Sequence, residues 1–265
     1  MDGRLAQNHV LVAQIATLQL PVVVVNQLRG NTGELSLDDL GWSSDHAQII
    51  HMTTLGLSVS RNAAMAALQS QWALLADDDI TLDVKAFALL TKRLQEDTYS
   101  DRVGALATRL MKDQNTPWRE GAQDLSILEG RQTEALRRIQ RINSMELVLN
   151  VSALRGWGVQ FDTRFGLGAP PTNGGEEVML LDSILRCGGR IVPVDVAPRL
   201  HPEESSGQAI NPATAFTQGA VHRLVFGVHR WPALFLVYTL KRIRAGNLAL
   251  VVNYAKGGKW ASRQA

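Results

Sequence analysis

The stretch Trp72-Ala73-Leu74-Leu75-Ala76-Asp77-Asp78-Asp79-Ile80 joins a short apolar run directly to three aspartates. An apolar run of this length predicts a strand that is buried on both faces of a sheet. Carboxylates that follow such a strand emerge at its carboxyl end, the edge at which open α/β sheets bind ligands. Because adjacent negative charges repel one another, the triplet needs a cation or strong donors, and its oxygens suit Mg²⁺ or Mn²⁺. The alternative is a solvated turn in which Asp79 caps the next element.

Outward from this stretch, apolar runs alternate with amphipathic segments along the chain. Such alternation predicts an α/β fold with parallel strands flanked by helices. Strands are expected at Val22–Val25, Gln48–Thr53, Trp72–Ala76, Val103–Met111, Glu146–Val151 and Arg190–Val196. Helices are expected at residues 4–18, Leu57–Leu68, Lys85–Glu96 and Glu176–Cys187, and irregular segments at residues 28–45, 112–140 and 162–175. From about residue 214 an apolar helical pattern returns, with an interruption near Trp231-Pro232.

Composition and charge bound the class of protein. The 265 residues are 45% hydrophobic and 20% charged, which is typical of a globular chain with a substantial core. The formal net charge of +2 gives no argument for nucleic acid binding, and the single cysteine, Cys187, excludes an intramolecular disulfide framework. We find neither a signal peptide nor an apolar run long enough to span a bilayer, so we expect a cytoplasmic protein.

The segment Gly56-Leu57-Ser58-Val59-Ser60-Arg61-Asn62 predicts a helix start with polar side chains crowded into its first turns. A helix N-terminus attracts phosphate, and Arg61 can add bidentate contacts to an anion. The alternative is a capped helix with a solvated Arg61. This segment taken alone favours neither.

Two later segments carry further polar groups. Gly174-Gly175-Glu176-Glu177 brings paired carboxylates to a helix start, where one of them can act as a general base. They also fit two ordinary acidic residues of a first helical turn. His201, in the polar loop 201–207, can complete the coordination of a metal if the fold returns it to the aspartates.

Taken together and in this order, these segments resemble the inverting glycosyltransferases of family 2, which have the GT-A fold. The resemblance covers about Val22 to Gly207 and is closest to bacterial surface-polysaccharide members. It implies a mixed, mostly parallel sheet flanked by helices. It also implies transfer of a sugar from a nucleotide-sugar, commonly a UDP-sugar, to a hydroxyl of a glycan or a lipid-linked acceptor.

The resemblance also implies a role for each matched residue. Asp77 and Asp79 form the Asp-x-Asp motif, in which Asp79 binds Mn²⁺ or Mg²⁺ and His201 is a third ligand after Asp77. Glu177 falls on the catalytic base, and Glu176 supports it. The residues implied on the nucleotide side are Asp77, Asp78, Arg61, Asn62, Asn26 and Gln27.

The chain departs from the family pattern at its first strand. The strand Val22–Val25 corresponds to the second strand of the family, and Asn26-Gln27 replaces the usual Asp-Asp. Either the first strand is degenerate, at His9–Ala13, or the start of the chain lies downstream of it. We expect residues 1–213 to form the catalytic domain and residues 214–265 a basic helical extension.

Residues 222–265 contain eight Lys or Arg and no Asp or Glu. The apolar stripe of this extension fits packing onto the catalytic domain. It also fits a basic amphipathic surface that makes peripheral contact with the inner face of a membrane, near a lipid-linked acceptor.

Two rival functions are weighed against the transferase. A sugar nucleotidyltransferase would need a basic, Gly-rich loop near the N-terminus, for which Gly30-Asn31-Thr32-Gly33 is a poor candidate. A degenerate protein that binds a nucleotide-sugar without turnover is favoured by the missing first strand. The presence of Asp79 and Glu177 favours the enzyme.

Overall fold

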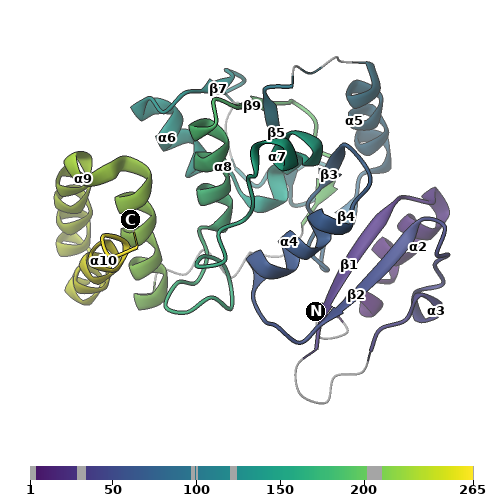
Figure 1. The fold of residues 1–265 in the computed structure, drawn as a ribbon, viewed down its shortest axis with the longest axis horizontal. Coiled ribbons are helices and arrows are strands. Elements are labelled where there is room, and N and C mark those ends of the chain that lie inside the picture. Colours follow the sequence, from purple (N-terminus) through teal and green to yellow (C-terminus); the bar gives the residue numbers. More distant parts are fainter. Residues whose placement is uncertain are drawn as a thin grey trace.

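The computed structural model describes residues 4–28, 34–96, 99, 101–119, 124–201 and 211–264. Its described strands form three sheets, with helices packed around them (Figure 1). The largest sheet has the order β3-β8-β5-β9-β7. Its strands are β3 (Trp72–Leu74), β5 (Val103–Ala107), β7 (Leu128–Glu129), β8 (Leu147–Asn150) and β9 (Arg190–Pro193). The expected mixed α/β architecture is therefore confirmed.

Strand directions in this sheet place the site. Strand β8 runs antiparallel to both β3 and β5, and β5 runs parallel to β9, so β3, β5 and β9 share one direction. Every residue of β5 and β8 is buried, as expected for strands covered on both faces. The carboxyl ends of β3, β5 and β9 consequently lie at one edge of the sheet, which we call the carboxyl edge.

A small three-stranded sheet follows the aspartates. Its order is β4-β10-β6, with β4 (Thr81–Leu82), β6 (Leu110–Met111) and β10 (Arg199–Leu200). The expected single strand Val103–Met111 is thus divided between β5 and β6. Since β10 leads directly into His201 and β4 directly follows Ile80, this sheet brings His201 back toward the triplet.

The N-terminal part forms a separate parallel pair, β1 (Val22–Gln27) and β2 (Ala47–Met52), with α1 (Arg4–Gln7), α2 (His9–Leu18) and α3 (Leu37–Leu40). The interpretation of His9–Ala13 as a degenerate strand is wrong, because these residues form the first half of α2. Among the described strands, β1 pairs with β2 alone. Figure 1 shows this pair at one end of the molecule.

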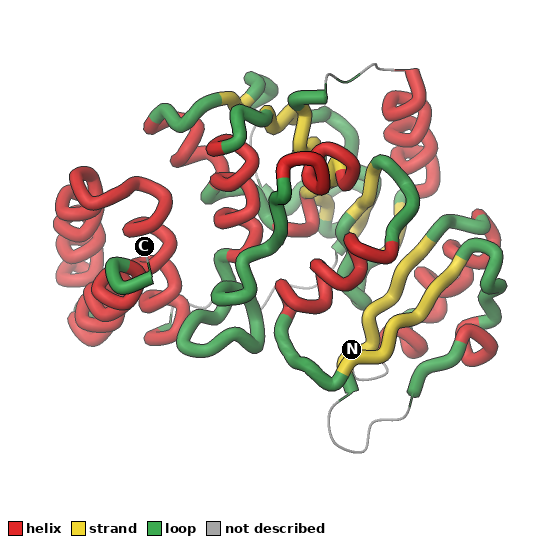
Figure 2. Tube along the Cα trace, viewed as in Figure 1, coloured by secondary structure: helices red, strands yellow, loops and turns green. Residues whose placement is uncertain are grey.

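The remaining helices of the body lie around the large sheet, and α4 also packs against β1 and β2. They are α4 (Leu57–Ala67), α5 (Val84–Glu96), α6 (Thr133–Ile139), the 3₁₀ turn η1 (Ser144–Glu146), α7 (Val151–Trp157) and α8 (Glu176–Arg186). The expectation that residues 112–140 are irregular is wrong in part, because they contain β7 and α6. Between α7 and α8 the chain runs as one long loop (Figure 2).

The C-terminal helices are α9 (Pro212–Arg244) and α10 (Leu248–Ala261), which pack against each other at the end of the molecule opposite β1 and β2 (Figure 1). The interruption of α9 lies at Gly227, whose φ of 78° is non-helical, and Pro232 is accommodated inside the helix. The prediction of a break near Trp231-Pro232 is therefore wrong by about one turn. Among the described residues, no helix combines the length and apolarity required to cross a membrane.

Candidate active site

The acidic triplet lies at the carboxyl edge, as the sequence predicts, and Leu75 and Ala76 separate it from the end of β3 at Leu74. Asp78 is buried, while the side chains of Asp77 and Asp79 are 43% and 39% exposed. The main chain of the triplet is held by α2. The Nδ2 atom of Asn8 donates to the carbonyls of Asp78 (3.1 Å) and Ile80 (2.6 Å). The N-terminal helix therefore fixes the turn that carries the aspartates.

Arg199 supports the same turn from inside the protein. Its side chain is fully buried, and its Nη1 atom donates to the Leu75 carbonyl at 2.6 Å. The Nη2 atom donates to Thr108 Oγ1 at 2.7 Å, at the end of β5. Burial lowers the pKa of Arg199 to about 9, while the carboxylates of Glu146 and Asp77 raise it. Arg199 thus places a positive charge behind the triplet and ties the ends of β3 and β5 together.

Arg61 connects the triplet to the paired glutamates. It lies buried on α4, where its Nη1 atom is 2.9 Å from Glu176 Oε1 and its Nη2 atom is 3.7 Å from Asp77 Oδ1. The guanidinium also lies over the ring of Phe161, 5.5 Å from its centroid. One side chain on α4 therefore joins Asp77 to Glu176, which lies 99 residues further along the sequence. The alternative of a solvated Arg61 is wrong.

The electrostatics of Asp77 reflect this setting. Burial raises its pKa, the Arg61 guanidinium lowers it, and the neighbouring Asp79 and Asp78 raise it further. Three carboxylates at this turn therefore repel one another, and Arg61 offsets this only in part. Such a site favours a bound cation.

Glu176 and Glu177 open helix α8, as predicted. The preceding Gly174 and Gly175 have φ values of 122° and 81°, a conformation that side chains other than glycine rarely adopt. Glu176 is buried against Arg61, whereas Glu177 is half-buried. Burial and the adjacent Glu176 carboxylate raise the pKa of Glu177 to about 8. A carboxylate of this kind is a stronger base than an exposed glutamate.

His201 lies beside the triplet. Its Nε2 atom is 3.3 Å from Asp79 Oδ1. Its main chain and ring are both fixed: the His201 amide donates to the Met111 carbonyl at 2.8 Å, and Trp118 Nε1 donates to the His201 carbonyl at 2.8 Å. The Trp118 ring packs edge-on against the imidazole. The polar loop expected after His201 lies, from residue 202 onward, outside the described residues.

The donor atoms of Asp79 and His201 fit a divalent cation. Asp79 Oδ1 is buried and has no hydrogen-bond partner in the described part of the chain, and it faces an imidazole nitrogen. Within the described residues, no group of three or more His, Cys, Asp or Glu side chains is arranged to hold a metal. A Mg²⁺ site that includes substrate phosphates requires only one or two protein carboxylates, so the pair fits such an ion.

The other residues predicted on the nucleotide side contact the protein itself. Asn62 exchanges two hydrogen bonds of 2.9 Å with the main chain of Phe161. Gln27 Nε2 donates to the carbonyls of Gly56 (2.9 Å) and Thr54 (3.2 Å). Asn26 is buried on β1, with its Nδ2 atom 3.4 Å from His51 Nδ1. The Gln27 and Asn62 amides thus hold the main chain of loops around the site, whereas Asn26 links β1 to His51 of β2.

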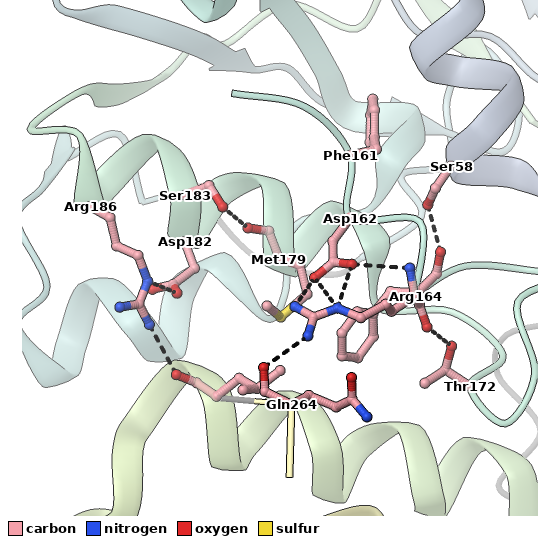
Figure 3. Close-up of polar contacts among 12 residues, drawn as sticks. Ser58, Phe161, Asp162, Arg164, Thr172, Met179, Asp182, Ser183, Arg186 and Gln264 are labelled. Carbon is pink, nitrogen blue, oxygen red and sulfur yellow. Dashed lines mark hydrogen bonds and ion pairs between the residues drawn. The ribbon is translucent and has the colours of Figure 1, made fainter. Parts of the chain in front are cut away.

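The loop between α7 and α8 is fixed at several points (Figure 3). Ser58 Oγ, at the start of α4, donates to the Phe165 carbonyl at 2.6 Å. Arg164 pairs with Asp162 and also donates to the Gln264 carbonyl at 3.2 Å. Thr172 Oγ1 donates to the Arg164 carbonyl at 2.6 Å. The start of α4 and the C-terminal end of the chain thus both hold the loop that delivers Glu176 and Glu177.

Sequence reasoning missed three residues of this arrangement: Asn8, Trp118 and Arg199. Asn8 carries a local signal, because it caps α2 by accepting from the Leu11 amide at 3.1 Å. That signal predicts a helix start and not a contact with a turn 70 residues away. Trp118 and Arg199 lie in short segments with no recognisable pattern. Their roles depend on contacts between distant parts of the chain.

Comparisons with known proteins identify the family and the fold. Residues 22–152 match the family model described as Glycosyl transferase family 2. The crystal structure of S. aureus TarS 1-349 is similar, with a TM-score of 0.57 and 14% identity over 98% of this chain and 88% of that one. Its complex with UDP gives the same values. Its complex with UDP-GlcNAc gives a TM-score of 0.55 and 13% identity, over 96% and 89%. No curated protein sequence matches. At these identities the structural likeness shows the GT-A fold.

Proposed function

Because the chain is a glycosyltransferase of family 2, we propose that it transfers a sugar from a UDP-sugar to a hydroxyl of a glycan or a lipid-linked acceptor. The donor proposal is supported by the UDP and UDP-GlcNAc complexes of the structurally similar TarS. The observation that carries the proposal is the position of Arg61. Its guanidinium contacts both Asp77 and Glu176, so the acidic triplet and the paired glutamates form one site.

The proposal includes a divalent cation, Mn²⁺ or Mg²⁺, held by Asp79 with His201 and Asp77. When bound, the ion supplies positive charge to the diphosphate of the donor. Asp77 and Asp78 lie on the nucleotide side of the same turn. Asn26, Gln27 and Asn62 act indirectly on the nucleotide: Gln27 and Asn62 hold loops that face it, and Asn26 links the ends of β1 and β2 through His51.

Glu177 is the proposed catalytic base. Its carboxylate accepts the proton of the acceptor hydroxyl as the hydroxyl oxygen bonds to the anomeric carbon of the sugar. The bond from that carbon to the diphosphate oxygen breaks, and the nucleoside diphosphate leaves with the bonding electrons. Attack opposite the leaving group inverts the anomeric carbon. Glu176 holds Arg61 and, by its charge, keeps the pKa of Glu177 high.

The direct test measures release of nucleoside diphosphate. Purified protein is incubated with Mn²⁺ and a panel of UDP- and GDP-sugars, with glycan and lipid-linked acceptors. We expect release with a UDP-sugar and its loss in Asp79→Ala. The matched control is Asp101→Ala, because Asp101 is exposed and precedes β5 at the opposite edge of the sheet. The anomeric configuration of the product, read by NMR, tests inversion.

Three results would contradict the proposal. Pyrophosphate formed from a nucleoside triphosphate and a sugar phosphate would identify a nucleotidyltransferase, whose candidate loop at residues 30–33 lies outside the described residues. Saturable donor binding without turnover on any acceptor would identify a binding protein. Retention of the donor's anomeric configuration would exclude Glu177 as the base of a single displacement.

A further inference from the structure

The part of α9 that follows the break at Gly227 has two apolar sides. One side packs against α10. Trp231 stacks on Tyr254 with ring centroids 6.2 Å apart, and Tyr238 stacks on the same ring at 4.1 Å. Arg242 lies over the Tyr238 ring at 5.0 Å. This side therefore accounts for the pairing of the two C-terminal helices.

The other side faces solvent. Residues Ala233, Leu236, Val237, Leu240 and Ile243 follow the spacing i, i+3, i+4, i+7 and i+10, which places them on one face of a helix. We call these five residues the apolar stripe. Its four large side chains are between 47% and 59% exposed, and Leu248 and Val252 on α10 are 60% and 54% exposed. A contiguous row of exposed large apolar side chains on one helix face is a feature of interaction surfaces.

Positive charge borders the stripe. At 3.6 residues per turn, Arg230 and Lys241 lie along one side of the stripe and Arg244 lies within it, near the end of the helix. All three are exposed. On α10, Lys256 and Lys259 are exposed as well. Since the sequence from Ser205 to Ala265 has eight Lys or Arg and no Asp or Glu, no acidic side chain of this part neutralises them.

This charge distribution selects the partner. In a symmetric pair of copies, the same patch meets itself, so Arg230, Lys241 and Arg244 of both copies would face one another. A bilayer with anionic headgroups offers the opposite: negative charge for the basic border and acyl chains for the stripe. The helix is too polar to insert across a bilayer, which leaves an orientation in the plane of the surface.

We propose that the apolar stripe of α9, with its basic border, docks the enzyme on the surface of an anionic lipid bilayer. The large side chains of the stripe enter the boundary between headgroups and acyl chains. Arg230, Lys241 and Arg244 contact lipid phosphates. This attachment is independent of the chemistry at the carboxyl edge of the sheet, and it goes beyond the proposed transfer reaction.

The test is co-sedimentation of the full chain with vesicles of phosphatidylcholine alone and of phosphatidylcholine mixed with phosphatidylglycerol. We expect binding to the mixed vesicles, weaker binding at high salt, and little binding to phosphatidylcholine alone. Lys241→Gln with Arg244→Gln should weaken partitioning by roughly tenfold or more, given the contribution of each cation near such a surface. Leu236→Ser with Leu240→Ser should weaken it to a similar degree.

The matched controls are on α5. Lys85→Gln with Lys92→Gln, and Val84→Ser with Leu89→Ser, change exposed side chains of the same kinds and should leave partitioning unchanged. Because every substituted position is exposed, thermal unfolding should show that all four variants fold. Equal binding of all variants, or no binding to mixed vesicles, would overturn the proposal. A dimer in sedimentation equilibrium that Leu236→Ser with Leu240→Ser dissociates, without vesicle binding, would assign the stripe to a second copy instead.

Discussion

Two arginines organise the site at the scale of single residues. Arg61 lies between Asp77 and Glu176, and Arg199 lies behind the triplet with hydrogen bonds to main-chain carbonyls and Thr108. Breaking a buried ion pair by removing one partner costs about 3–5 kcal/mol, because the other charge is left uncompensated. This cost applies to Arg61 and Glu176, whereas Arg199 acts on Glu146 and Asp77 through the charge that it holds nearby.

The clearest prediction at this scale concerns the pH dependence of Glu177. A general base must be ionised, so kcat/KM should rise with pH through the raised pKa of Glu177, near 8, and be lost as pH falls. Glu177→Gln should retain donor binding and lower transfer by roughly 10²–10⁴-fold. It should also abolish the rise of kcat/KM with pH near 8. The measurement is kcat/KM from pH 5 to 10 for both proteins. The same rise of kcat/KM with pH in Glu177→Gln would show that Glu177 is not the catalytic base.

Stability gives a second readout of the same group. A carboxyl whose pKa is higher in the folded than in the unfolded state binds protons more tightly when folded. Its contribution to the free energy of unfolding therefore falls as pH rises from the ordinary value of 4.5 toward about 8. Relative to wild type, Glu177→Gln should gain stability across this window in urea denaturation. A constant difference would show that the Glu177 pKa is not raised.

At the scale of elements, α2 acts as a brace for the acidic turn. Besides Asn8, its Gln14 exchanges hydrogen bonds of 2.8 and 2.9 Å with the main chain of Leu82. Side chains of this helix and of its cap thus form hydrogen bonds with the main chain on both sides of Ile80, which is fully buried. The site depends on a segment that carries none of its chemistry.

Asn8→Asp tests this brace. Asn8 has two functions: its Oδ1 atom caps α2, and its Nδ2 atom donates to the Asp78 and Ile80 carbonyls. Aspartate keeps the cap acceptor, removes both donors and places a negative charge next to the triplet. We expect a loss of about 1–3 kcal/mol in unfolding free energy and weaker donor binding, measured by urea denaturation and calorimetric titration. Donor affinity equal to wild type would show that α2 does not position the turn.

Helices α9 and α10 approach closely through glycine. A Cβ atom on Gly219 would overlap the carbonyl oxygen of Tyr254, and one on Gly257 would overlap that of Phe216. We expect Gly219→Ala and Gly257→Ala each to destabilise the protein by about 1–3 kcal/mol, because backbone must move. Gly156→Ala is the control: Gly156 lies in α7 with open space around it and should be neutral or stabilising. Urea midpoints compare the three; destabilisation of Gly156→Ala alone would contradict the packing.

At the scale of the whole molecule, the C-terminal helices share the main core. Ala220, Val221, Val225 and Phe226 of α9 and Ala261 of α10 belong to the same buried cluster as strands β5, β8 and β9. His222 adds a polar tie, with its ring nitrogens 2.6 Å from Tyr254 Oη and from Gln140 Oε1. The parts of the chain before and after the expected boundary at residue 213 therefore bury their apolar side chains in one common core.

From this shared core we expect one cooperative unfolding transition for the full chain. Differential scanning calorimetry should give a single peak, and Trp fluorescence and far-UV circular dichroism should report the same midpoint. A chain truncated after residue 213 should lose this transition, because the cluster would be exposed to water. Two separate transitions in the full chain would show that residues 214–265 fold as an independent domain.

The sequence alone determined the elements that carry the chemistry. The apolar run before Asp77, the Gly-rich entry to Glu176 and the helix of Arg61 are local patterns, since periodicity and turn residues act over a few positions. Their order along the chain was sufficient for the family resemblance. Sequence patterns did not predict two other segments correctly. His9–Ala13, considered as a degenerate first strand, is helical, and residues 112–140 contain β7 and α6, which are too short to give a periodic signal.

The tertiary structure decided how these elements meet. Arg61 contacts both Asp77 and Glu176, and His201 lies beside Asp79. Asn8 and Arg199 hold the turn. These contacts join residues that are 16 to 124 positions apart in the sequence. Burial and charge then act on these neighbours, raising the pKa of Glu177 and lowering that of Arg199. Desolvation depends on burial, and Coulomb interactions depend on distance in space. The sequence therefore determines which residues form the acidic stretch, whereas the fold alone determines the groups that surround them.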